Sequence, residues 1–474
     1  MAGNKKILFI ADDGRNLVFT FILVCSLFLL WGLCNGMIDV MDKHFQEELS
    51  LSKSQSAWVQ FAHYLGYFLM SLPAGWLASR LGYKGGIIAG LLIVAVGGLW
   101  FIPATQINAM VHEGRVSPTT AFVAFLAGVC VIATGLTFLE TIANPYTTVL
   151  GDRRYAAIRI NLAQSCNGVG WICGPIVGSV YFYSKDALGH STGSQTLYIP
   201  YVGIAIIVIV LAAVFYFADI PDIKTGDDYH LDDAAPGASH SIWSHPHFVM
   251  AVVAQFFYVA AQAGIFSFFI NYMTSEVPPM PLSWQAAMGS ISAHAPFLQG
   301  WLSGWFETGL NGALGLSNKG ASNIASIGLV CFLAGRFSGA GLLRKFVAHK
   351  VLGIYGALNV AATLLVFCKL GWLSVACVFL SYFFMSIMFP TIFALGIFGL
   401  GARAKKASAF IVMAIIGGAI LPKLMGHVAD RYDMSRGFIV PACCFVVVAF
   451  YGFNWPGFSR VGSRQGMKAP SLHG

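Results

Sequence analysis

The sequence predicts an all-α membrane protein with twelve transmembrane helices in two pseudo-symmetric six-helix halves. Hydrophobic residues make up 57% of the 474 residues and charged residues only 10%, and the mean hydropathy is +0.72. Soluble domains carry about 25% charged residues, so this composition excludes a soluble globular protein. The apolar runs are also too long for barrel strands, which cross a bilayer in about 10 residues of alternating polarity. Short motifs that recur in both halves of the chain predict the pseudo-symmetry.

Twelve apolar segments are separated by charged or Pro/Gly-rich loops, and each is near the 20 or so residues that a membrane crossing needs. They lie near residues 18–41, 56–79, 85–104, 119–146, 159–182, 198–218, 247–273, 321–343, 350–370, 372–400, 405–428 and 437–456. The widest cytoplasmic interruption carries six aspartates and leaves six segments on either side. The sequence therefore predicts an N-terminal half over 1–218, a cytoplasmic linker over 219–245 and a C-terminal half over 246–474.

The basic residues predict the orientation of the chain in the membrane. Eighteen Lys and Arg side chains lie in loops on the side of the N-terminus and eight in loops on the other side. Cytoplasmic loops carry the excess of Lys and Arg, so both termini are expected in the cytoplasm. Because these charges are spread between apolar segments, the net charge of +8 does not indicate nucleic-acid binding.

A long connection over 274–320 is expected on the outer side and carries Trp284, Trp301 and Trp305. Loops of this length are commonly functional or disordered, and tryptophan favours the membrane interface. Two interpretations stay open, a lid or interfacial segment and a tolerated insertion.

Repeated motifs relate the two halves. Trp31 and Asn35 in the first segment have the same spacing as Tyr258 and Gln262 in the seventh. NPYTTVLG in the fourth segment is matched by FPTIFALG in the tenth, with a proline six residues before a glycine in both. Duplicated halves that share a midplane site are typical of secondary transporters.

Two acids, Asp39 and Glu140, are predicted to be the only ones deep inside the apolar segments. A carboxylate at the centre of a membrane helix costs about 2.5–3.5 kcal/mol on insertion scales, so such residues tend to be functional. Asn35 and Asn144 lie four residues from Asp39 and Glu140, which places each acid on one helix face with an amide. The pattern predicts carboxyls that bind and release protons. The alternatives are a solvated Asp39 near the outer end and a Glu140 that holds helices together.

Neutral amides form a second set, on two other segments. Gln164 and Asn167 are three residues apart, and Gln255, Tyr258 and Gln262 share one face of the seventh segment. Amides both donate and accept hydrogen bonds, and an aromatic face covers the apolar face of a sugar ring. This chemistry predicts a neutral sugar ligand, and the alternative is hydrogen bonding between helices.

Four basic residues are candidates for an inner gate. Arg80 and Lys84 follow the second segment, and Arg344 follows the eighth at a similar distance from a glycine. Arg336 lies about two turns inside the eighth segment, where it either braces its own half or closes the gate. Enzyme signatures such as HExxH or a Walker A motif are missing from the sequence, and the ten cysteines show no metal-ligand spacing. We therefore expect neither enzymatic activity nor a cofactor or metal.

Several strings resemble the fucose:proton symporter family of the major facilitator superfamily. They include LLWGLCNGMID (29–39), FLETIANPYTTVLG (138–151), NLAQSCNGVG (161–170) and MSIMFPTIFALG (385–396). The resemblance implies coupled uptake of sugar and protons by rocking of the two halves. Asp39 and Glu140 stand at the family's two protonatable positions.

The same resemblance places Gln164 and Asn167 at sugar-contacting amides. Gly36 and Phe389 depart from the fucose pattern, so it implies a hexose or amino-hexose rather than L-fucose in particular, with Phe389 still at the site. The expected protein is a monomeric multi-pass carrier of the bacterial inner membrane, with a neutral monosaccharide, a proton and the lipid bilayer as its partners. A sugar uniporter, a sodium-coupled carrier, a non-transporting sugar sensor and a channel are the alternatives.

Overall fold

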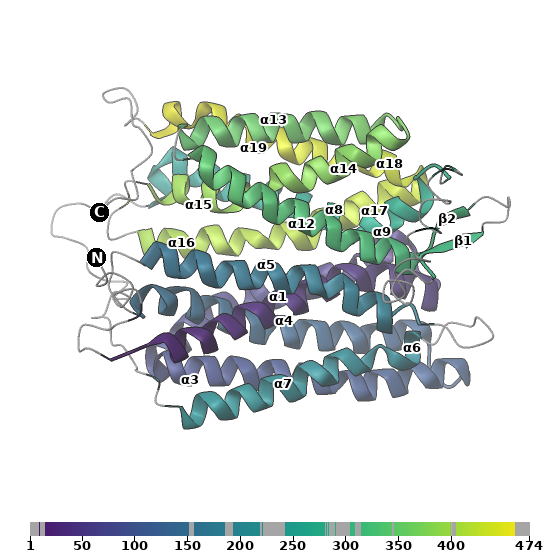
Figure 1. Cartoon of the computed structure of the whole chain (residues 1–474), viewed down its shortest axis with the longest axis horizontal. Helices are drawn as coiled ribbons and strands as arrows, with labels where there is room; N and C mark the ends of the chain where they lie inside the picture. The colour runs from purple at the N-terminus through teal and green to yellow at the C-terminus, as the bar shows by residue number, and fades with distance from the viewer. Residues whose placement is uncertain are drawn as a thin grey trace.

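The protein folds into a bundle of long, roughly parallel and antiparallel helices (Figure 1). The computed structural model describes residues 9, 15–150, 156–184, 193–218, 220, 242–279, 281, 283, 290, 304–308, 314–343, 346–398, 400 and 404–459. Most of the predicted linker 219–245 lies outside these residues. Ten helices in the described part are long and apolar enough to cross a membrane. The other two predicted segments, 56–79 and 159–182, lie on helices α3 and α5.

The described residues of the N-terminal helix group form seven helices. They are α1 (Val18–Glu48), α2 (Lys53–Ser56), α3 (Trp58–His112), α4 (Pro118–Val149), α5 (Ala156–Tyr181), α6 (Gly193–Thr196) and α7 (Tyr198–Phe217). Two predicted segments are merged in α3, which is broken at Gly82, where φ is 70°. Glycine adopts this left-handed conformation without a steric penalty. At the start of α4 the Ser117 side chain accepts a hydrogen bond from the Thr120 backbone N–H, as an N-cap does.

The C-terminal helix group follows the linker. It contains η2 (Ile242–Ser244), α8 (Pro246–Ser267), α9 (Phe269–Ser275), α12 (Asn318–Leu343), α13 (Ala348–Phe367), α14 (Trp372–Met385), α15 (Met388–Ile397), α16 (Ala404–Met413), η4 (Ala414–Ile416), α17 (Gly417–Arg431), α18 (Met434–Gly437) and α19 (Ile439–Ser459). The predicted segment 372–400 is interrupted between α14 and α15, and 405–428 is interrupted by η4.

The long connection 274–320 contains regular structure at its end. Strands β1 (Phe306–Thr308) and β2 (Leu314–Leu316) pair antiparallel just before α12. Trp305 is buried there with 6% of its surface exposed, and its carbonyl accepts a hydrogen bond from the Ser317 N–H at 2.9 Å. Trp284 and Trp301 lie outside the described residues. This end of the loop is therefore packed against the bundle rather than free at its surface.

Close packing of small residues positions the helices of the N-terminal group. A Cβ added at Gly32 of α1 would lie 2.0 Å from the Asn167 carbonyl oxygen of α5, and one added at Gly174 would lie 2.5 Å from the Gly36 Cα. Small residues let backbones approach this closely in membrane helices. The contact fixes the rotation of α5 relative to α1, and therefore the positions of their polar side chains.

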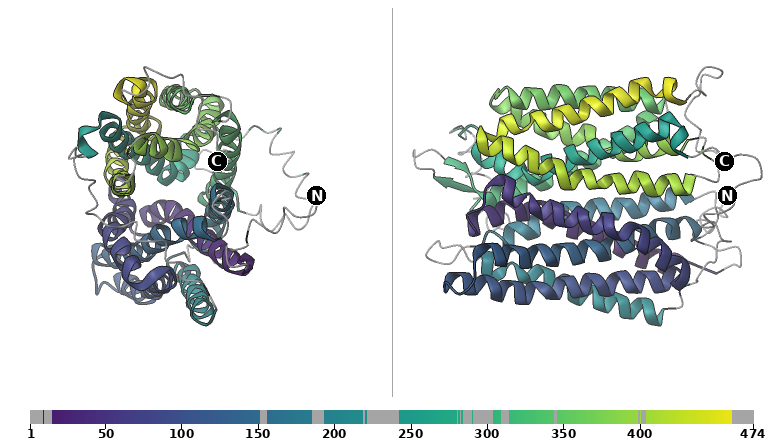
Figure 2. Two further views of the ribbon diagram at one scale, coloured as in Figure 1. Left: turned by 90° about the vertical axis from the view of Figure 1, so that its left-hand side faces the viewer. Right: turned by 180° about the vertical axis from the view of Figure 1, so that it is seen from behind.

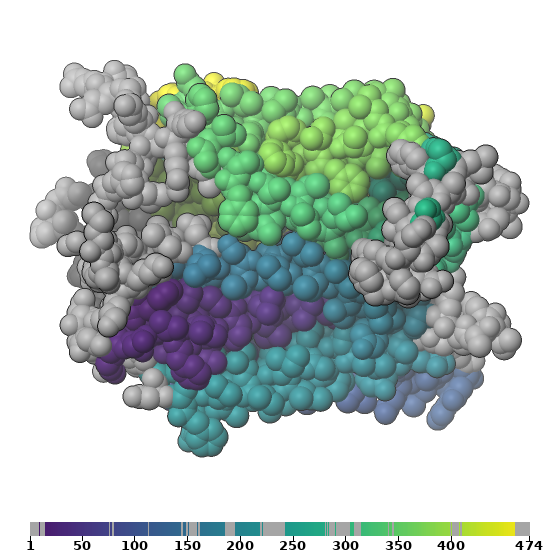
Figure 3. Space-filling model, in the orientation of Figure 1, coloured from purple at the N-terminus to yellow at the C-terminus, as the bar shows by residue number. Residues whose placement is uncertain are grey.

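The two helix groups lie side by side, as the view down the bundle shows (Figure 2). At one end of the bundle are β1, β2, α2 and the end of α1, and we call it the hairpin end. Helix α1 begins and α19 finishes at the opposite end (Figure 1). The surface is continuous between α5 and α12 toward the hairpin end and is hollowed between them toward the opposite end (Figure 3). The groups therefore meet most closely at the hairpin end.

Candidate substrate and proton site

Asp39 lies within α1 and is partly buried between the helices. Its Oδ1 accepts a hydrogen bond from the Gln60 amide of α3 at 3.1 Å. The helix does not end near residue 41 as predicted but continues to Glu48, and the polar residues Asp42 and His44 in this extension are buried. Asp39 therefore occupies an interior part of α1, more than two turns from the helix end.

Glu140 of α4 is half-buried beside two tyrosines of α3. Tyr64 lies within electrostatic reach of both Asp39 and Glu140, and Tyr67 lies within reach of Glu140. The Tyr67 hydroxyl accepts a hydrogen bond from the Trp31 indole N–H at 2.8 Å. Side chains from α1, α3 and α4 thus form one polar and aromatic wall around the two acids.

Asn35 adds an amide to this wall. Its carbonyl oxygen is buried and has no hydrogen-bond partner among the described residues. His63 is also buried, with its ring 5.0 Å from the rings of both Tyr64 and Tyr67, and its Nδ1 has no partner there either. Buried polar atoms are usually satisfied, so these two atoms are available to a ligand or to water. The side chain of Asn144 lies outside the described part of the structure.

The two amides of α5 differ in their surroundings. Gln164 is half-buried. Asn167 is 7% exposed, and its Nδ2 donates a hydrogen bond to the Phe28 carbonyl of α1 at 3.2 Å. This contact joins two helices, as the alternative interpretation of the amides predicted. An amide carries two N–H donors and a carbonyl oxygen, so Asn167 keeps capacity for a ligand.

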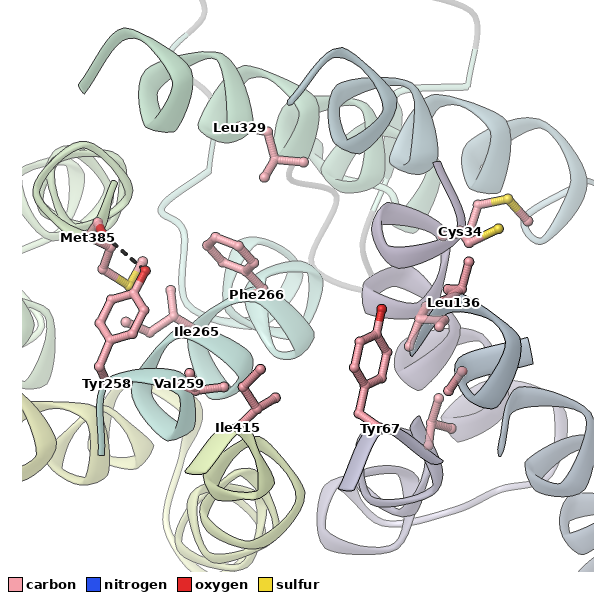
Figure 4. Packing of buried hydrophobic residues seen from close by; sticks show 14 of the residues in the cluster. Cys34, Tyr67, Leu136, Tyr258, Val259, Ile265, Phe266, Leu329, Met385 and Ile415 are labelled. Atoms are coloured by element: carbon pink, nitrogen blue, oxygen red, sulfur yellow. Dashed lines mark hydrogen bonds between the residues drawn. The ribbon is translucent and has the colours of Figure 1, made fainter. Parts of the chain in front are cut away.

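The three predicted ligand residues of α8 also differ from one another. Tyr258 is fully buried and its hydroxyl donates to the Met385 carbonyl at 3.0 Å, so it points into the C-terminal helix group (Figure 4). Gln255 is fully buried, and neither amide atom has a partner among the described residues. Gln262 is only half-buried. Phe389 packs edge-to-face on Tyr258, with ring centroids 6.4 Å apart.

Aromatic and apolar side chains surround the space between the two groups near these residues. Phe266 and Leu329 come from the C-terminal group, and Tyr67 faces them from α3 (Figure 4). Phe266 also contacts Trp171 of α5 edge-to-face, with centroids 5.5 Å apart. The aromatic lining at the junction of the two groups therefore includes Tyr67, which also belongs to the wall around Glu140.

Among the described residues, three of the four predicted gate residues have their contacts within their own helix group. The Arg80 guanidinium lies 4.1 Å from the centroid of the Trp76 ring, and Lys84 Nζ donates to the Ala218 carbonyl at 2.8 Å. Arg336 Nε is 3.5 Å from the Ser386 carbonyl oxygen, so Arg336 braces its own group. Arg344 lies outside the described residues.

Hydrogen bonds between described residues of the two groups lie toward the hairpin end. Asp430 of α17 accepts from the backbone N–H groups of Lys53 at 2.9 Å and Ser54 at 2.8 Å. Gln46 and Asn271 exchange hydrogen bonds through their side-chain amides. Along α5 and α12, Ser179 donates to Asn323, Ser322 to the Pro175 carbonyl and Ser326 to the Ile172 carbonyl, at 3.0, 2.7 and 2.7 Å.

The expectation that Asp39 and Glu140 are the only acids deep in the bundle is wrong. Asp42, three residues after Asp39, has no exposed surface, and neither carboxylate oxygen has a hydrogen-bond partner in the described part of the chain. The sequence carried a signal for it, since positions three apart share a helix face. It was missed because the apolar segment ends near residue 41, before the helix does.

Comparison with known proteins identifies the family. The model of the Major Facilitator Superfamily matches residues 20–310. The chain belongs to the Major Facilitator Superfamily. This superfamily member is 34% identical over 459 residues to the L-fucose-proton symporter of Escherichia coli, with 93% of this chain and 94% of the relative covered. It is 29% identical to a glucose/galactose transporter of Brucella abortus, with 92% and 94% covered. The resemblance predicted from the sequence motifs is confirmed.

Solved structures give the same assignment for this Major Facilitator Superfamily chain. A crystal structure of the superfamily transporter FucP in the outward conformation has a TM-score of 0.63 and 32% sequence identity. The match covers 93% of this chain and 99% of that one. A D-xylose-proton symporter, only 11% identical, also gives a TM-score of 0.63 and shares the fold.

Proposed function

We propose that the protein is a secondary active transporter that takes up a neutral hexose or amino-hexose together with a proton by alternating access. The polar and aromatic wall around Asp39 and Glu140 is the observation that carries this proposal. Both acids lie inside a bundle whose relatives include a proton symporter for L-fucose and transporters for glucose and galactose. A carboxyl that loses and regains a proton in the interior can couple proton movement to a change of conformation.

Sugar binding is assigned to the amides and aromatic residues at the junction of the two groups. Asn35 and Gln255 have buried amide atoms without partners among the described residues, as a site awaiting sugar hydroxyls would have. Gln164, Gln262 and Phe389 are half-buried there. Asn144 and Asn167 complete the proposed set, with Asn167 also joining α1 to α5. Tyr258 contributes indirectly, because its ring packs against Phe389 while its hydroxyl donates to the Met385 carbonyl.

The proposed architecture is twelve transmembrane helices in two six-helix halves in the bacterial inner membrane. The first part of α3 and helix α5 supply the eleventh and twelfth spans, in addition to the ten that meet the length and hydropathy criteria. The Lys and Arg distribution supports cytoplasmic termini, which makes the hairpin end the outer end. We expect a monomer that acts as a carrier and not as an enzyme.

The described conformation is then closed to the outside and open toward the cytoplasm. In the described part of the chain, hydrogen bonds between the groups lie toward the hairpin end, whereas the contacts of Arg80, Lys84 and Arg336 at the other end are within their own group. FucP was crystallised in the outward conformation. A different placement of the two halves accounts for a TM-score that is no higher than that of the much less identical xylose symporter.

Glu140→Gln tests the coupling mechanism. The amide mimics a permanently protonated acid, so the variant should bind sugar and exchange it across vesicle membranes while losing accumulation against a gradient. Counterflow and gradient-driven uptake of labelled L-fucose, glucose, galactose and amino-hexoses would be measured side by side. Glu113→Gln is the matched control, because Glu113 is an exposed acid that pairs with Arg115. A Glu140→Gln protein that concentrates sugar like the parent, with unchanged pH dependence, would refute proton symport and favour a uniporter or a sodium-coupled carrier.

A further inference from the structure

Asp42 is the one acidic side chain in the described residues that has no exposed surface and no hydrogen bond to either oxygen. It lies on α1, one turn from Asp39 toward the hairpin end. The proposed coupling mechanism uses Asp39 and Glu140 and gives Asp42 no role. A buried, unpartnered carboxyl is costly to keep, so its presence in the interface calls for a function.

The residue that faces Asp42 comes from the other helix group. Ser267, the last residue of α8, lies beside the Asp42 carboxyl, is fully buried, and has a hydroxyl without a partner among the described residues. Asp39 on α1 and Tyr183 after α5 are the titratable groups within electrostatic reach of Asp42. Neither is a cation, and the neighbouring Lys43 pairs instead with Glu47 at 3.4 Å. The Tyr183 hydroxyl donates its hydrogen bond to the Val40 carbonyl, at 2.8 Å.

An ionised carboxylate fits this environment poorly. It would be desolvated, would have no cation beside it among the described residues and only the Ser267 hydroxyl as a nearby donor, and would lie one turn from a second acid. A neutral carboxylic acid has an O–H that can donate to the Ser267 hydroxyl. Ser267 can pair with either form, so burial and the neighbouring acid decide, and the closed interface favours the protonated acid over the ionised one.

A cavity at the hairpin end lies close to Asp42 along α1, although Asp42 itself does not line it. The cavity has a volume of about 320 Å³ and is lined by Lys43 and Gln46, which lie one and four positions after Asp42, and by Lys53 and Asp430 of the contact between the groups. Separation of α1 from α8 at this end would widen the cavity to Asp42 and move Ser267 away.

We propose that Asp42 is a proton-binding residue of the outer gate, neutral and facing Ser267 when the gate is closed and ionised in outer water when the gate is open. Closing takes up one proton from the outer solution, and opening returns that proton to the same side. The step makes closure more favourable as the external pH falls. It rests on the alternating-access function proposed above and adds a third titratable carboxyl to it.

The gate is tested by a distance measurement that needs no transport. Spin labels at Arg115→Cys and Tyr432→Cys, both exposed at the hairpin end on different groups, would report the open and closed populations in nanodiscs between pH 5 and 9. The ten native cysteines would first be replaced. In the parent, the ratio of closed to open protein should fall by up to tenfold per pH unit for each proton taken up on closing.

The Asp42→Asn variant should remain mostly closed between pH 5 and 9, and its ratio of closed to open protein should lose the pH dependence that one bound proton causes. The Asp39→Asn variant should retain that pH dependence. Asp42→Leu, which cannot titrate, should lose the same pH dependence. Ser267→Ala should retain it but close about 2- to 10-fold less at each pH, as expected for loss of one hydrogen bond. An Asp42→Asn or Asp42→Leu protein with the pH dependence of the parent would overturn the proposal, as would a gate that responds to sodium and not to pH.

Failure of the proposed function would be seen separately. If vesicles of the parent take up no labelled hexose in response to a proton gradient while the gate still titrates through Asp42, the gate proposal stands and sugar–proton symport does not. If proton-driven uptake is present and the gate distances are independent of pH, the symport function stands and the role of Asp42 is refuted.

Discussion

The hairpin end and the opposite end of the bundle are held together in different ways. At the hairpin end Asp430 bridges from α17 to the backbone of α2, and Gln46 pairs with Asn271. At the opposite end Arg80 and Lys84 bind within the N-terminal group and Arg336 within the C-terminal group. The contacts at the first end must break in a transport cycle, whereas the contacts at the second can persist.

This difference lets each helix group stay rigid while the two groups change position relative to each other. Contacts within a group include backbones that nearly touch, as Gly32 of α1 and α5 do. Contacts between the groups at the hairpin end are mostly a few polar side chains, which are individually worth about 1 kcal/mol. A two-state equilibrium is reversible in function only when its free-energy difference is a few kcal/mol.

The largest expected effect comes from a side chain that prevents the two groups from meeting. A Cβ at Gly426 of α17 would lie 2.8 Å from the Lys53 carbonyl oxygen, with no flexible atom to give way. Gly426→Leu should disfavour the closed hairpin end by about 1–3 kcal/mol, which lowers its population about 5- to 150-fold. Uptake should fall while sugar binding from outside persists.

Gly341→Leu is the matched control, because a Cβ there has no atom within 4 Å. Spin-label distances at the hairpin end and vesicle uptake would be compared for both variants. Normal closure of Gly426→Leu would contradict the assignment of this contact to the outer gate.

The next effect comes from the carboxylate that binds α2. Asp430→Ala removes two hydrogen bonds to backbone N–H groups and the ion pair with Lys53 at 3.9 Å. Hydrogen bonds to charged groups are worth about 1.5–3 kcal/mol, and partial exposure of Asp430 reduces this to about 1–2 kcal/mol. The closed population should fall about 5- to 30-fold in the same distance measurement. If the distance distribution did not change, the serine contacts between α5 and α12, and not Asp430, would hold the hairpin end closed.

A smaller effect is expected from a cation–π contact between the groups. Lys423 Nζ of α17 lies 3.7 Å from the centroid of the Trp58 ring of α3. Such contacts are worth about 0.5–1 kcal/mol at partly exposed sites, so Lys423→Met should lower closure about 2- to 5-fold. Arg80→Met is the control, because it removes the same kind of contact within one group and should leave the hairpin-end distances unchanged. If both variants changed the hairpin-end distances equally, the proposed difference between the two ends would be wrong.

The smallest effect is expected for a surface ion pair inside the C-terminal group. Partial burial alone raises the pKa of Asp433, but the Arg436 backbone N–H and Lys369, whose Nζ is 2.9 Å away, outweigh it and hold the pKa below its usual range. A lowered folded-state pKa stabilises the protein above the ordinary Asp pKa of about 4, and the stabilisation is lost as the pH falls through the lowered value.

Asp433→Asn should therefore cost at most about 1 kcal/mol at pH 7 and nothing at strongly acidic pH. Thermal unfolding of the solubilised protein at the two pH values measures this difference. The gate distances should not change, and a shift in them would show that the group is not rigid.

Local physics explains what could be predicted before the structure. Apolar segments are recognised by transfer free energies that add residue by residue, so the helical membrane class follows from composition and segment length. Asp39 and Glu140 stand out for the same reason, since an acid in an apolar segment is costly in any packing. The motifs around Asn35 and Gln164 were sufficient to indicate the family.

Contacts that depend on helix rotation required the structure. Whether Asn167 reaches a sugar or the Phe28 carbonyl is decided by how closely α5 approaches α1, and Tyr258 bonds to Met385 because the end of α14 lies beside this part of α8. Sequence spacing places side chains on a face of a helix but does not say what that face meets.

The sequence by itself determined a helical membrane protein with interior acids, because hydropathy and helical periodicity are properties of a few consecutive residues. Tertiary structure alone decided that α1 extends beyond its apolar segment and buries Asp42, and that the hairpin end is the closed one. The first depends on polar residues covered by helices distant in sequence. The second depends on a balance of a few kcal/mol between two arrangements of the same helices, which composition does not encode.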